Sequence, residues 1–433
     1  MCIYKSKKRR SFMSSLNYAK EMDQKDPLKN YKSRFNVQKD TYYMDGNSLG
    51  LCSVDAKDTL IDVLNEWRNE GIKIWGSRDG KFYNYPQFLG EKMSRLINAK
   101  PEEVVAMGSI TSNLHQLLAT FYHPSKARFK ILVDELNFPS DIYAVKSILE
   151  LHGQTIDTSL KVVKSRDGKF LDEKDIIDAM DEDVAIALLP SVLYRSAQIL
   201  DMELITAGAH KKGVIIGWDL AHGIGAIPYD FSKSEPDFAV WCTYKYLNGG
   251  PGSTAGLYVN RRHFGKSVGL KGWFGCAPEK QFQMSHDFYG ANDARAFLQG
   301  TPNMLSMAPL EGALDMFLEA GMENLRKKSL LLTDYLVELI EEKLAPLGFA
   351  VGSPIEHKKR GGHVALEHDD AYQISIAMRK EGVIPDFRDP NVIRLAPVPF
   401  YIGFEDVYRV VEITEKIAKE GKYKEAKSDE LVY

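Results

Sequence analysis

Four side chains with different chemistry stand at the ends of two apolar segments in the middle of the chain. Asp219 ends the run GVIIGWD, and His222 follows three residues later. Tyr244 and Lys245 follow the run FAVWCT and precede a glycine-rich loop. A carboxylate, an imidazole, a phenol and an amine on one edge of a sheet could hold a protonated ring nitrogen, transfer protons and form an imine.

Each of these residues also has an ordinary structural explanation. Lys245 could be a solvated residue at a strand end, and His222 a hydrogen-bonded core histidine. Asp219 could form a structural salt bridge or cap a helix, because a buried carboxylate without a partner is very costly. The combination of residues, rather than any one of them, favours a reactive site.

A third segment provides a candidate phosphate site. The sequence VVAMGSITSNLHQLLATFY passes from a short apolar strand through Gly108, Ser109 and Thr111 into a helix. A helix N-terminus with free amides and nearby hydroxyls binds phosphate, although a plain N-cap explains the same residues. A phosphate site, an acid for a ring nitrogen and an imine-forming lysine together indicate pyridoxal phosphate chemistry.

The elements that must position these residues follow an α/β pattern. Segments at 140–153 and 201–213 are helical in character and end in glycine. Their alternation with strands predicts a mostly parallel sheet covered by helices on both faces, with ligands at the carboxyl ends of the strands. The last predicted strand follows too short a connection for a crossover, so it should run antiparallel and make the sheet mixed. The predicted strands are 130–136, 184–190, 213–219, 238–243 and 254–259.

Composition and length limit the classes of protein to which the chain can belong. The 433 residues are 44% apolar and 27% charged with a net charge of −3, which is typical of a globular protein acting on a small molecule. Nothing in this charge balance favours a nucleic acid or a membrane as partner. The four cysteines, which lack C-x-x-C spacing, predict neither a disulfide framework nor a metal site and fit the cytoplasm. They are Cys2, Cys52, Cys242 and Cys276.

We expect three parts along the chain. Residues 1–45 are predicted to form an N-terminal arm, 46–310 a large cofactor-binding domain, and 311–433 a smaller C-terminal α+β domain. Residues 1–12 are strongly basic, and we expect them to be disordered or dispensable.

Six motifs, occurring in order, carry a family resemblance. They are DGNSLGL (45–51), NFPSD (137–141), WDLAH (218–222), YKYLNGGPG (244–252), GWFG (272–275) and IRLAPVPFY (393–401). The chain resembles the kynureninases, which are homodimeric pyridoxal phosphate enzymes of fold type I. This resemblance implies hydrolysis of L-kynurenine to anthranilate and L-alanine in tryptophan catabolism and NAD biosynthesis, with 3-hydroxykynurenine as a second substrate.

The resemblance also implies a role for each matched residue. Lys245 would bind the cofactor covalently and Tyr244 would protonate the substrate carbon after cleavage, so these two are the catalytic residues. The cofactor-binding set is Ile110, Thr111, Phe138, Pro139, Ser140, Asp141, Asp219, His222, Tyr244, Lys245, Trp273 and Thr301. The substrate-binding set is Asn47, Ser48, Trp75 and Arg394, of which Arg394 would bind the α-carboxylate.

Three positions depart from the family pattern. Trp75 and Thr301 stand where many animal-type members have His and Asn near the aryl ring, so we expect kynurenine to be preferred over 3-hydroxykynurenine. Pro190 stands where some relatives have a hydroxyl, which leaves Ser191 as a less certain cofactor contact. In relatives Trp273 and position 301 reach the phosphate of the neighbouring subunit, which implies active sites at a homodimer interface.

Two other functions share part of this pattern. Another fold-type-I enzyme, such as a cysteine desulfurase or a class-V-like aminotransferase, would also use Asp219, His222 and Lys245. A desulfurase needs a nucleophilic cysteine, for which Cys276 is the candidate, although a small packing residue explains it better. The second alternative is a ligand-binding protein on the same scaffold, which would lack the covalent bond to the cofactor.

Overall fold

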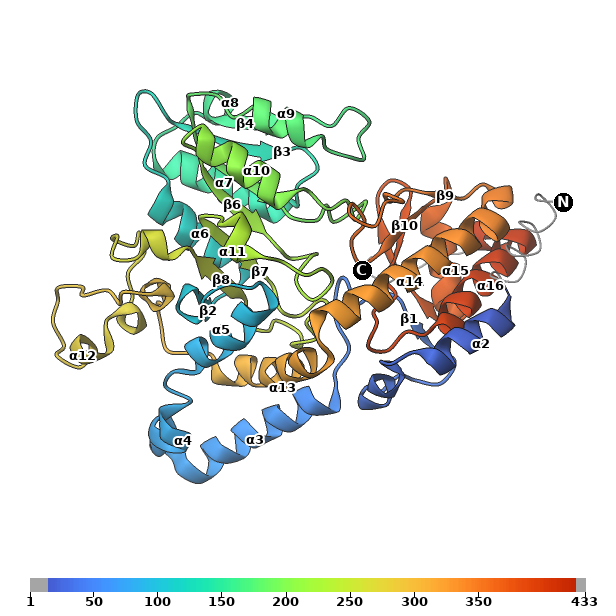
Figure 1. Cartoon of the computed structure of the whole chain (residues 1–433), viewed down its shortest axis with the longest axis horizontal. Helices are drawn as coiled ribbons and strands as arrows, with labels where there is room; N and C mark the ends of the chain where they lie inside the picture. The colour runs from blue at the N-terminus through green and yellow to red at the C-terminus, as the bar shows by residue number, and fades with distance from the viewer. Residues whose placement is uncertain (1–14, 426–433) are drawn as a thin grey trace. The chain divides into compact units, whose positions relative to one another are not determined.

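The computed structural model describes residues 15–425, so the basic segment predicted at 1–12 lies outside the described residues. The contacts within the chain divide it into two compact units (Figure 1). Unit 1 contains the residues up to Val54, the short segment Arg195–Ile199 and the residues from Glu319 onward. Unit 2 contains Asp55–Tyr194 and Leu200–Leu318.

Unit 2 is built on a seven-stranded sheet in the order β2-β8-β7-β6-β5-β3-β4. Strands β3 to β7 pair in parallel, whereas β8 runs antiparallel to both β7 and β2. The predicted mixed, mostly parallel sheet is therefore confirmed. Its strands are β2 (Val104–Ala106), β3 (Lys130–Asp134), β4 (Leu160–Val163), β5 (Val184–Pro190), β6 (Ile215–Asp219), β7 (Phe238–Trp241) and β8 (Gly256–Val259).

The five predicted strands are present, but their ends differ from the prediction. The run predicted from 213 begins at Ile215, because Gly213 has a φ of +68° and ends the preceding helix instead. The run predicted to 136 ends at Asp134, whose Oδ1 accepts a hydrogen bond from the amide of Leu136 (2.9 Å) and turns the chain away from the sheet. A side chain that bonds to the backbone two residues on favours a turn over a strand.

Helices bury both faces of this sheet. Successive side chains of a strand alternate between the faces, so Ile186 and Leu188 pack in one hydrophobic cluster with residues of α6 and α7. On the other face Trp218 donates to Thr206 of α10 (3.1 Å). The long helices of unit 2 are α3 (Val54–Glu70), α5 (Tyr85–Leu96), α6 (Ile110–Phe121), α7 (Pro139–Leu151), α10 (Met202–Lys211) and α13 (Met304–Ala320).

Shorter helices connect these elements. In chain order they are α4 (Ser77–Gly80), α8 (Ile156–Ser159), α9 (Glu173–Asp178), α11 (Phe231–Ser234) and α12 (Pro278–Gln281). Helix α3 packs on α13, where the hydroxyl of Thr59 donates to the carbonyl of Ala308 (2.7 Å). Within residues 15–425, no helix combines the length and the apolar character needed to span a membrane.

Unit 1 has the α+β composition predicted for the smaller domain. An antiparallel sheet has the order β12-β13-β10-β9, and a parallel pair joins β1 to β11. The strands are β1 (Tyr42–Tyr43), β9 (Ala350–Val351), β10 (Val364–Glu367), β11 (Val383–Ile384), β12 (Asp386–Arg388) and β13 (Val392–Leu395). The helices are α2 (Leu16–Lys25), α14 (Met322–Leu339), α15 (Ala371–Lys380) and α16 (Phe404–Glu420).

The predicted division into an arm over 1–45 and domains over 46–310 and 311–433 differs from these units. Helix α2 belongs to the C-terminal unit because the carboxylate of Asp23 accepts hydrogen bonds from the amides of Phe404 (2.7 Å) and Glu405 (2.9 Å). These amides begin α16 and have no partner inside that helix. A side chain near the N-terminus of the chain thus caps its last long helix, which sequence patterns alone do not reveal.

The packing of β6 on β7 yields a test. A Cβ at Gly217 would overlap the ring of Phe238, which is fully buried and stacks on Phe121 with ring centroids 5.2 Å apart. We expect Gly217→Ala to lower the free energy of unfolding by about 1–3 kcal/mol, because overpacking strains a filled core. Gly300→Ala is the matched control, since nothing lies within 4 Å of its Cβ. Urea denaturation that gives the two variants equal stability would contradict this account of the core.

Candidate active site

The loops that follow β6 and β7 bring together Asp219, His222 and Lys245 in unit 2. Asp219 ends β6, and its Oδ1 accepts a hydrogen bond from the amide of Ala221 (2.7 Å), which forms the turn leading to His222. Nζ of Lys245, in the loop after β7, lies 2.8 Å from Nε2 of His222. The side chains predicted to share one edge of the sheet are therefore in direct contact or directly adjacent.

A second carboxyl group lies against Asp219. Asp141, in the first turn of α7, is 1% exposed, and among the described residues no N–H or O–H group donates to either of its oxygens. Burial first, and the neighbouring Asp219 second, raise the pKa of Asp141 well above its usual range. The raised pKa favours the protonated form of Asp141 beside Asp219.

Burial and the neighbouring charges act on the pKa of Asp219 in opposite directions. Burial raises the pKa of Asp219, while the charge of Lys245, the amide of Ala221 and the hydrogen bond from Asp141 oppose that rise. Two buried carboxyl groups therefore lie beside a primary amine. A buried carboxylate fits a protonated ring nitrogen, because such a group supplies it with a positive partner.

Aromatic rings surround the amine of Lys245. Nζ lies 5.8 Å from the ring centroid of Phe138, whose side chain is 42% exposed. The ring of Phe138 meets Tyr194 edge to face at 5.5 Å, and Tyr194 lies 6.3 Å from the ring of His222. An exposed aromatic face beside a buried carboxylate can stack on a planar heterocycle. Sequence reasoning missed Tyr194, although this residue, like Asp219 and Lys245, stands just after the carboxyl end of a strand, here β5.

The first turns of α6 and α7 meet close by in the same unit. Ser109 is the N-cap of α6, Ile110 its first residue, and Pro139 the first residue of α7. The hydroxyls of Thr111 and Ser140 are 2.6 Å apart and share a hydrogen bond that links the two turns. Two joined helix N-termini with hydroxyl groups form a suitable site for a phosphate group.

Tyr244 lies near the buried thiol of Cys242. Burial, followed by the contact with Cys242, raises the pKa of Tyr244 above its ordinary range. Tyr244 is therefore protonated at physiological pH and can act as a proton donor. The loop that follows turns at Gly250 and Gly252, whose φ values of +94° and +65° favour glycine.

Ser191, a less certain candidate, has its polar groups bonded within the protein. Its hydroxyl is 2.7 Å from that of Tyr229, and its amide donates to the carbonyl of Asp219 (2.8 Å). Its side chain is 1% exposed. Ser191 thus joins the end of β5 to the end of β6.

Two of the predicted substrate residues meet in unit 1. Arg394, on β13, is 1% exposed and forms an ion pair with the fully buried Asp386 through Nε and Nη2. Nη2 also donates to Oγ of Ser48 (3.1 Å). Asn47, the residue before Ser48, is fully buried. The motif DGNSLGL therefore supplies part of the surroundings of Arg394.

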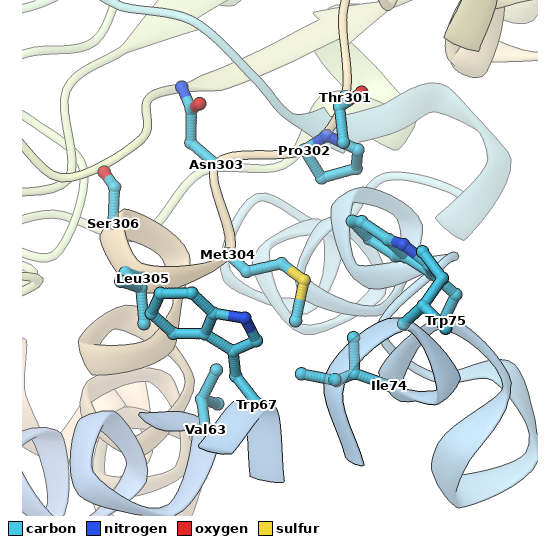
Figure 2. A pocket seen from close by; sticks show the side chains of 12 residues that line it. Val63, Trp67, Ile74, Trp75, Thr301, Pro302, Asn303, Met304, Leu305 and Ser306 are labelled. Carbon is cyan, nitrogen blue, oxygen red and sulfur yellow. The ribbon is translucent and has the colours of Figure 1, made fainter. Parts of the chain in front are cut away.

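Trp75 and Thr301 line one cavity of about 670 Å³ in unit 2. Figure 2 shows Trp75 and Trp67 on the two sides of this space with Met304 between them. The lining comes from α3, the turn Gly71–Gly76 and the start of α13, and it is mostly apolar. Trp273 does not line this cavity; it is 44% exposed, and its Nε1 donates to the carbonyl of Gln281 (3.0 Å).

Comparison with known proteins identifies the family. A family model described as the kynureninase C-terminal domain matches residues 325–414. The kynureninase of Geobacillus thermodenitrificans is 51% identical to this chain over 418 residues, which cover 96% of this chain and 98% of the relative. The chain belongs to the kynureninase family. A kynureninase of Bacillus cereus is 50% identical over 414 residues, which cover 96% of this kynureninase-family chain and 97% of the relative.

Solved structures show the same fold in more distant proteins. An apo cysteine desulfurase from Thermococcus onnurineus superposes with a TM-score of 0.75 at 17% identity, covering 90% of this chain and 98% of its own. A variant of the protein C-DES, with glycine covalently linked to its PLP cofactor, gives 0.75 at 16% identity and covers 88% and 98%. At such identities the likeness shows the fold alone, so it does not favour the desulfurase alternative over the kynureninase family.

The carboxyl pair leads to a pH prediction. The pKa of Asp141 is raised in the folded protein, so its stabilising contribution is complete at acidic pH and is lost as pH rises toward that pKa. An amide in Asp141→Asn donates to Asp219 without ionising. Thermal unfolding of the protein without added cofactor, from pH 5 to 9, should show less alkaline destabilisation in this variant than in the wild type.

Asp141→Ala is the control, because it removes the group that can donate a hydrogen bond to Asp219. We expect this variant to be less stable than Asp141→Asn by about 1–3 kcal/mol. Wild-type and Asp141→Asn curves that run parallel over the whole pH range would show that Asp141 is not the proton carrier.

Proposed function

We propose that this kynureninase-family protein hydrolyses the Cβ–Cγ bond of L-kynurenine to give anthranilate and L-alanine, with pyridoxal phosphate as cofactor. The observation that carries the proposal is 51% identity over nearly the whole chain to a protein named kynureninase. The contact of Lys245 with His222, next to the buried charge of Asp219, supports the choice of cofactor.

The residues of unit 2 fit this cofactor group by group. Lys245 would hold it covalently, and Asp219 would keep its ring nitrogen protonated. Phe138 would pack on the ring, while Ile110, Thr111 and Ser140 would bind the phosphate through the joined helix turns. Pyridoxal phosphate, when bound, withdraws electrons from the substrate carbon that carries the amino group.

The protein's own groups then move the protons. The amine of Lys245 would remove the proton from the substrate Cα, and His222 at 2.8 Å would hold that amine in place. A water molecule adds to the aryl ketone, and cleavage releases anthranilate. Tyr244, which keeps its proton at physiological pH, donates to Cβ of the alanine fragment and recovers a proton from the added water, and Lys245 returns its proton to Cα. Water is the second reactant, so the reaction needs no oxidant or reductant.

Binding of the substrate draws on the remaining predicted residues. Arg394 would bind the α-carboxylate, and Asn47 and Ser48 would orient it. Trp75 and Thr301 would contact the aryl ring, a role supported by the mostly apolar cavity that they share.

We infer that the working form is a homodimer in which Trp273 and Thr301 contribute to the partner's phosphate site. One face of α3 supports this inference: Ile61, Leu64 and Trp67 are 46%, 45% and 54% exposed, although apolar. Contiguous apolar surface of this kind marks interaction sites. Analytical ultracentrifugation should give twice the chain mass of 48.9 kDa. A fully active monomer would disprove the inferred homodimer. The cytoplasmic location and the link to NAD biosynthesis stay predictions.

Activity is tested with the protein loaded with pyridoxal phosphate. Added L-kynurenine should yield fluorescent anthranilate and L-alanine in equal amounts. Lys245→Ala should lose the yellow colour of the bound cofactor and at least about 10³-fold in kcat, because it lacks both the covalent link and the base. Lys211→Ala, on the exposed side of α10, is the control and should keep both. Turnover by Lys245→Ala at the wild-type rate would exclude the proposed role.

The cavity at Trp75 predicts the substrate preference. A mostly apolar lining offers few partners for an added ring hydroxyl, which costs about 1–3 kcal/mol when it stays unpaired. We expect kcat/KM for kynurenine to exceed that for 3-hydroxykynurenine by about tenfold or more. The double variant Trp75→His with Thr301→Asn should lower the ratio of kcat/KM for kynurenine to kcat/KM for 3-hydroxykynurenine. A wild-type preference for the hydroxylated substrate would contradict the assignment.

A further inference from the structure

The buried Arg394 lies in a cluster with the partly exposed Arg388 and two buried carboxyl groups. Asp386 and Arg394 face each other across β12 and β13, and Nη2 of Arg388 is 3.3 Å from Oδ1 of Asp386. Asp45 reaches the cluster from a separate segment, which forms a bridge with Ala396 two residues beyond Arg394. The second carboxyl group of the cluster thus comes from the motif that also carries Ser48.

Asp45 is the member of the cluster that titrates near neutrality. Its side chain is buried, and its Oδ1 has no hydrogen-bond partner among the described residues. Burial, and then the charge of Asp386, raise the pKa of Asp45 to about 7, against the opposing effects of Ser48 and of the two arginines. The charged and titratable groups that face Asp45 are Asp386, Arg388, Arg394 and Tyr43. Burial raises the pKa of Tyr43, so this phenol stays neutral.

The proton on Asp45 decides the net charge of the cluster. When Asp45 is protonated, two guanidinium groups face one carboxylate and an unbalanced positive charge remains. When Asp45 ionises, the charges balance. The cluster attracts a carboxylate ligand when Asp45 is protonated and attracts it little when Asp45 is ionised. The difference is large in a protein interior, which screens charge poorly.

We propose that Asp45 is a positioning residue for the substrate carboxylate: its proton leaves the cluster around Arg394 with the positive charge that this carboxylate needs. The proposal rests on the proposed function, in which Arg394 binds the substrate. Binding of a carboxylate must then favour protonated Asp45, so binding takes up a proton, and rising pH weakens it. The expected effect falls on KM rather than on kcat, because Asp45 acts before any bond changes.

The test compares three proteins loaded with pyridoxal phosphate: the wild type, Asp45→Asn and Asp369→Asn. Asp369 is an exposed aspartate of the same unit, so the control makes the same chemical change away from the cluster. We expect the ratio of the wild-type KM for L-kynurenine to that of Asp45→Asn to rise up to about tenfold per pH unit above pH 7. Asp369→Asn should follow the wild type. A KM ratio that does not change between pH 6 and 9 overturns the proposal.

A second measurement separates this proposal from the proposed function. Calorimetric titration with L-alanine, in buffers of different ionisation enthalpy at pH 7.5, counts the protons taken up on carboxylate binding. The wild type should take up more than Asp45→Asn, whether or not kynurenine is hydrolysed; equal uptake overturns the role of Asp45. Failure of hydrolysis with unequal uptake would reject the proposed function alone. Asp45→Ser serves the same comparison if Asp45→Asn does not fold.

Discussion

The buried carboxylate of Asp219 is the interaction on which the active site depends. A charge at the end of a central strand, buried in the protein, must be neutralised or paired. Two neighbours affect it: the pKa of Asp141 is itself raised, and the charge of Lys245 opposes the rise of the Asp219 pKa. His222 holds Lys245 at hydrogen-bond distance. A protonated ring nitrogen would give Asp219 a further positive partner. The same buried charge therefore relates the fold, the amine and the cofactor.

The two units handle charge in similar ways. In unit 2 two buried carboxyl groups lie beside Lys245, and in unit 1 two buried carboxyl groups lie beside Arg394. Burial raises the pKa of Asp141 and Asp219 in the first pair and of Asp45 in the second. One pair suits a cationic ring, whereas the other, with two arginines, suits a carboxylate ligand.

Sequence reasoning predicted the elements better than their relations. Alternating apolar runs and glycine-ended helices predicted the mixed sheet, and the strand-end rule correctly placed Asp219 and Lys245 at one edge of it. It missed Tyr194, whose contact with Phe138 depends on loop geometry. It could not foresee Asp45 as a titrating group, since burial and the approach of Asp386 arise only in the folded chain. The predicted domain boundaries differ from the two units because Asp23 of α2 caps the N-terminus of α16. This contact joins residues about 380 positions apart.

The central claim is that Lys245, beside Asp219 and His222, is the residue that carries the cofactor. Borohydride reduction of the protein loaded with pyridoxal phosphate fixes the attachment, and mass spectrometry of the peptides then locates it. We predict one modified lysine per chain, at position 245 in the peptide that contains YKYLNGG. Modification of a different lysine, or none in a protein that still cleaves kynurenine, would contradict the account.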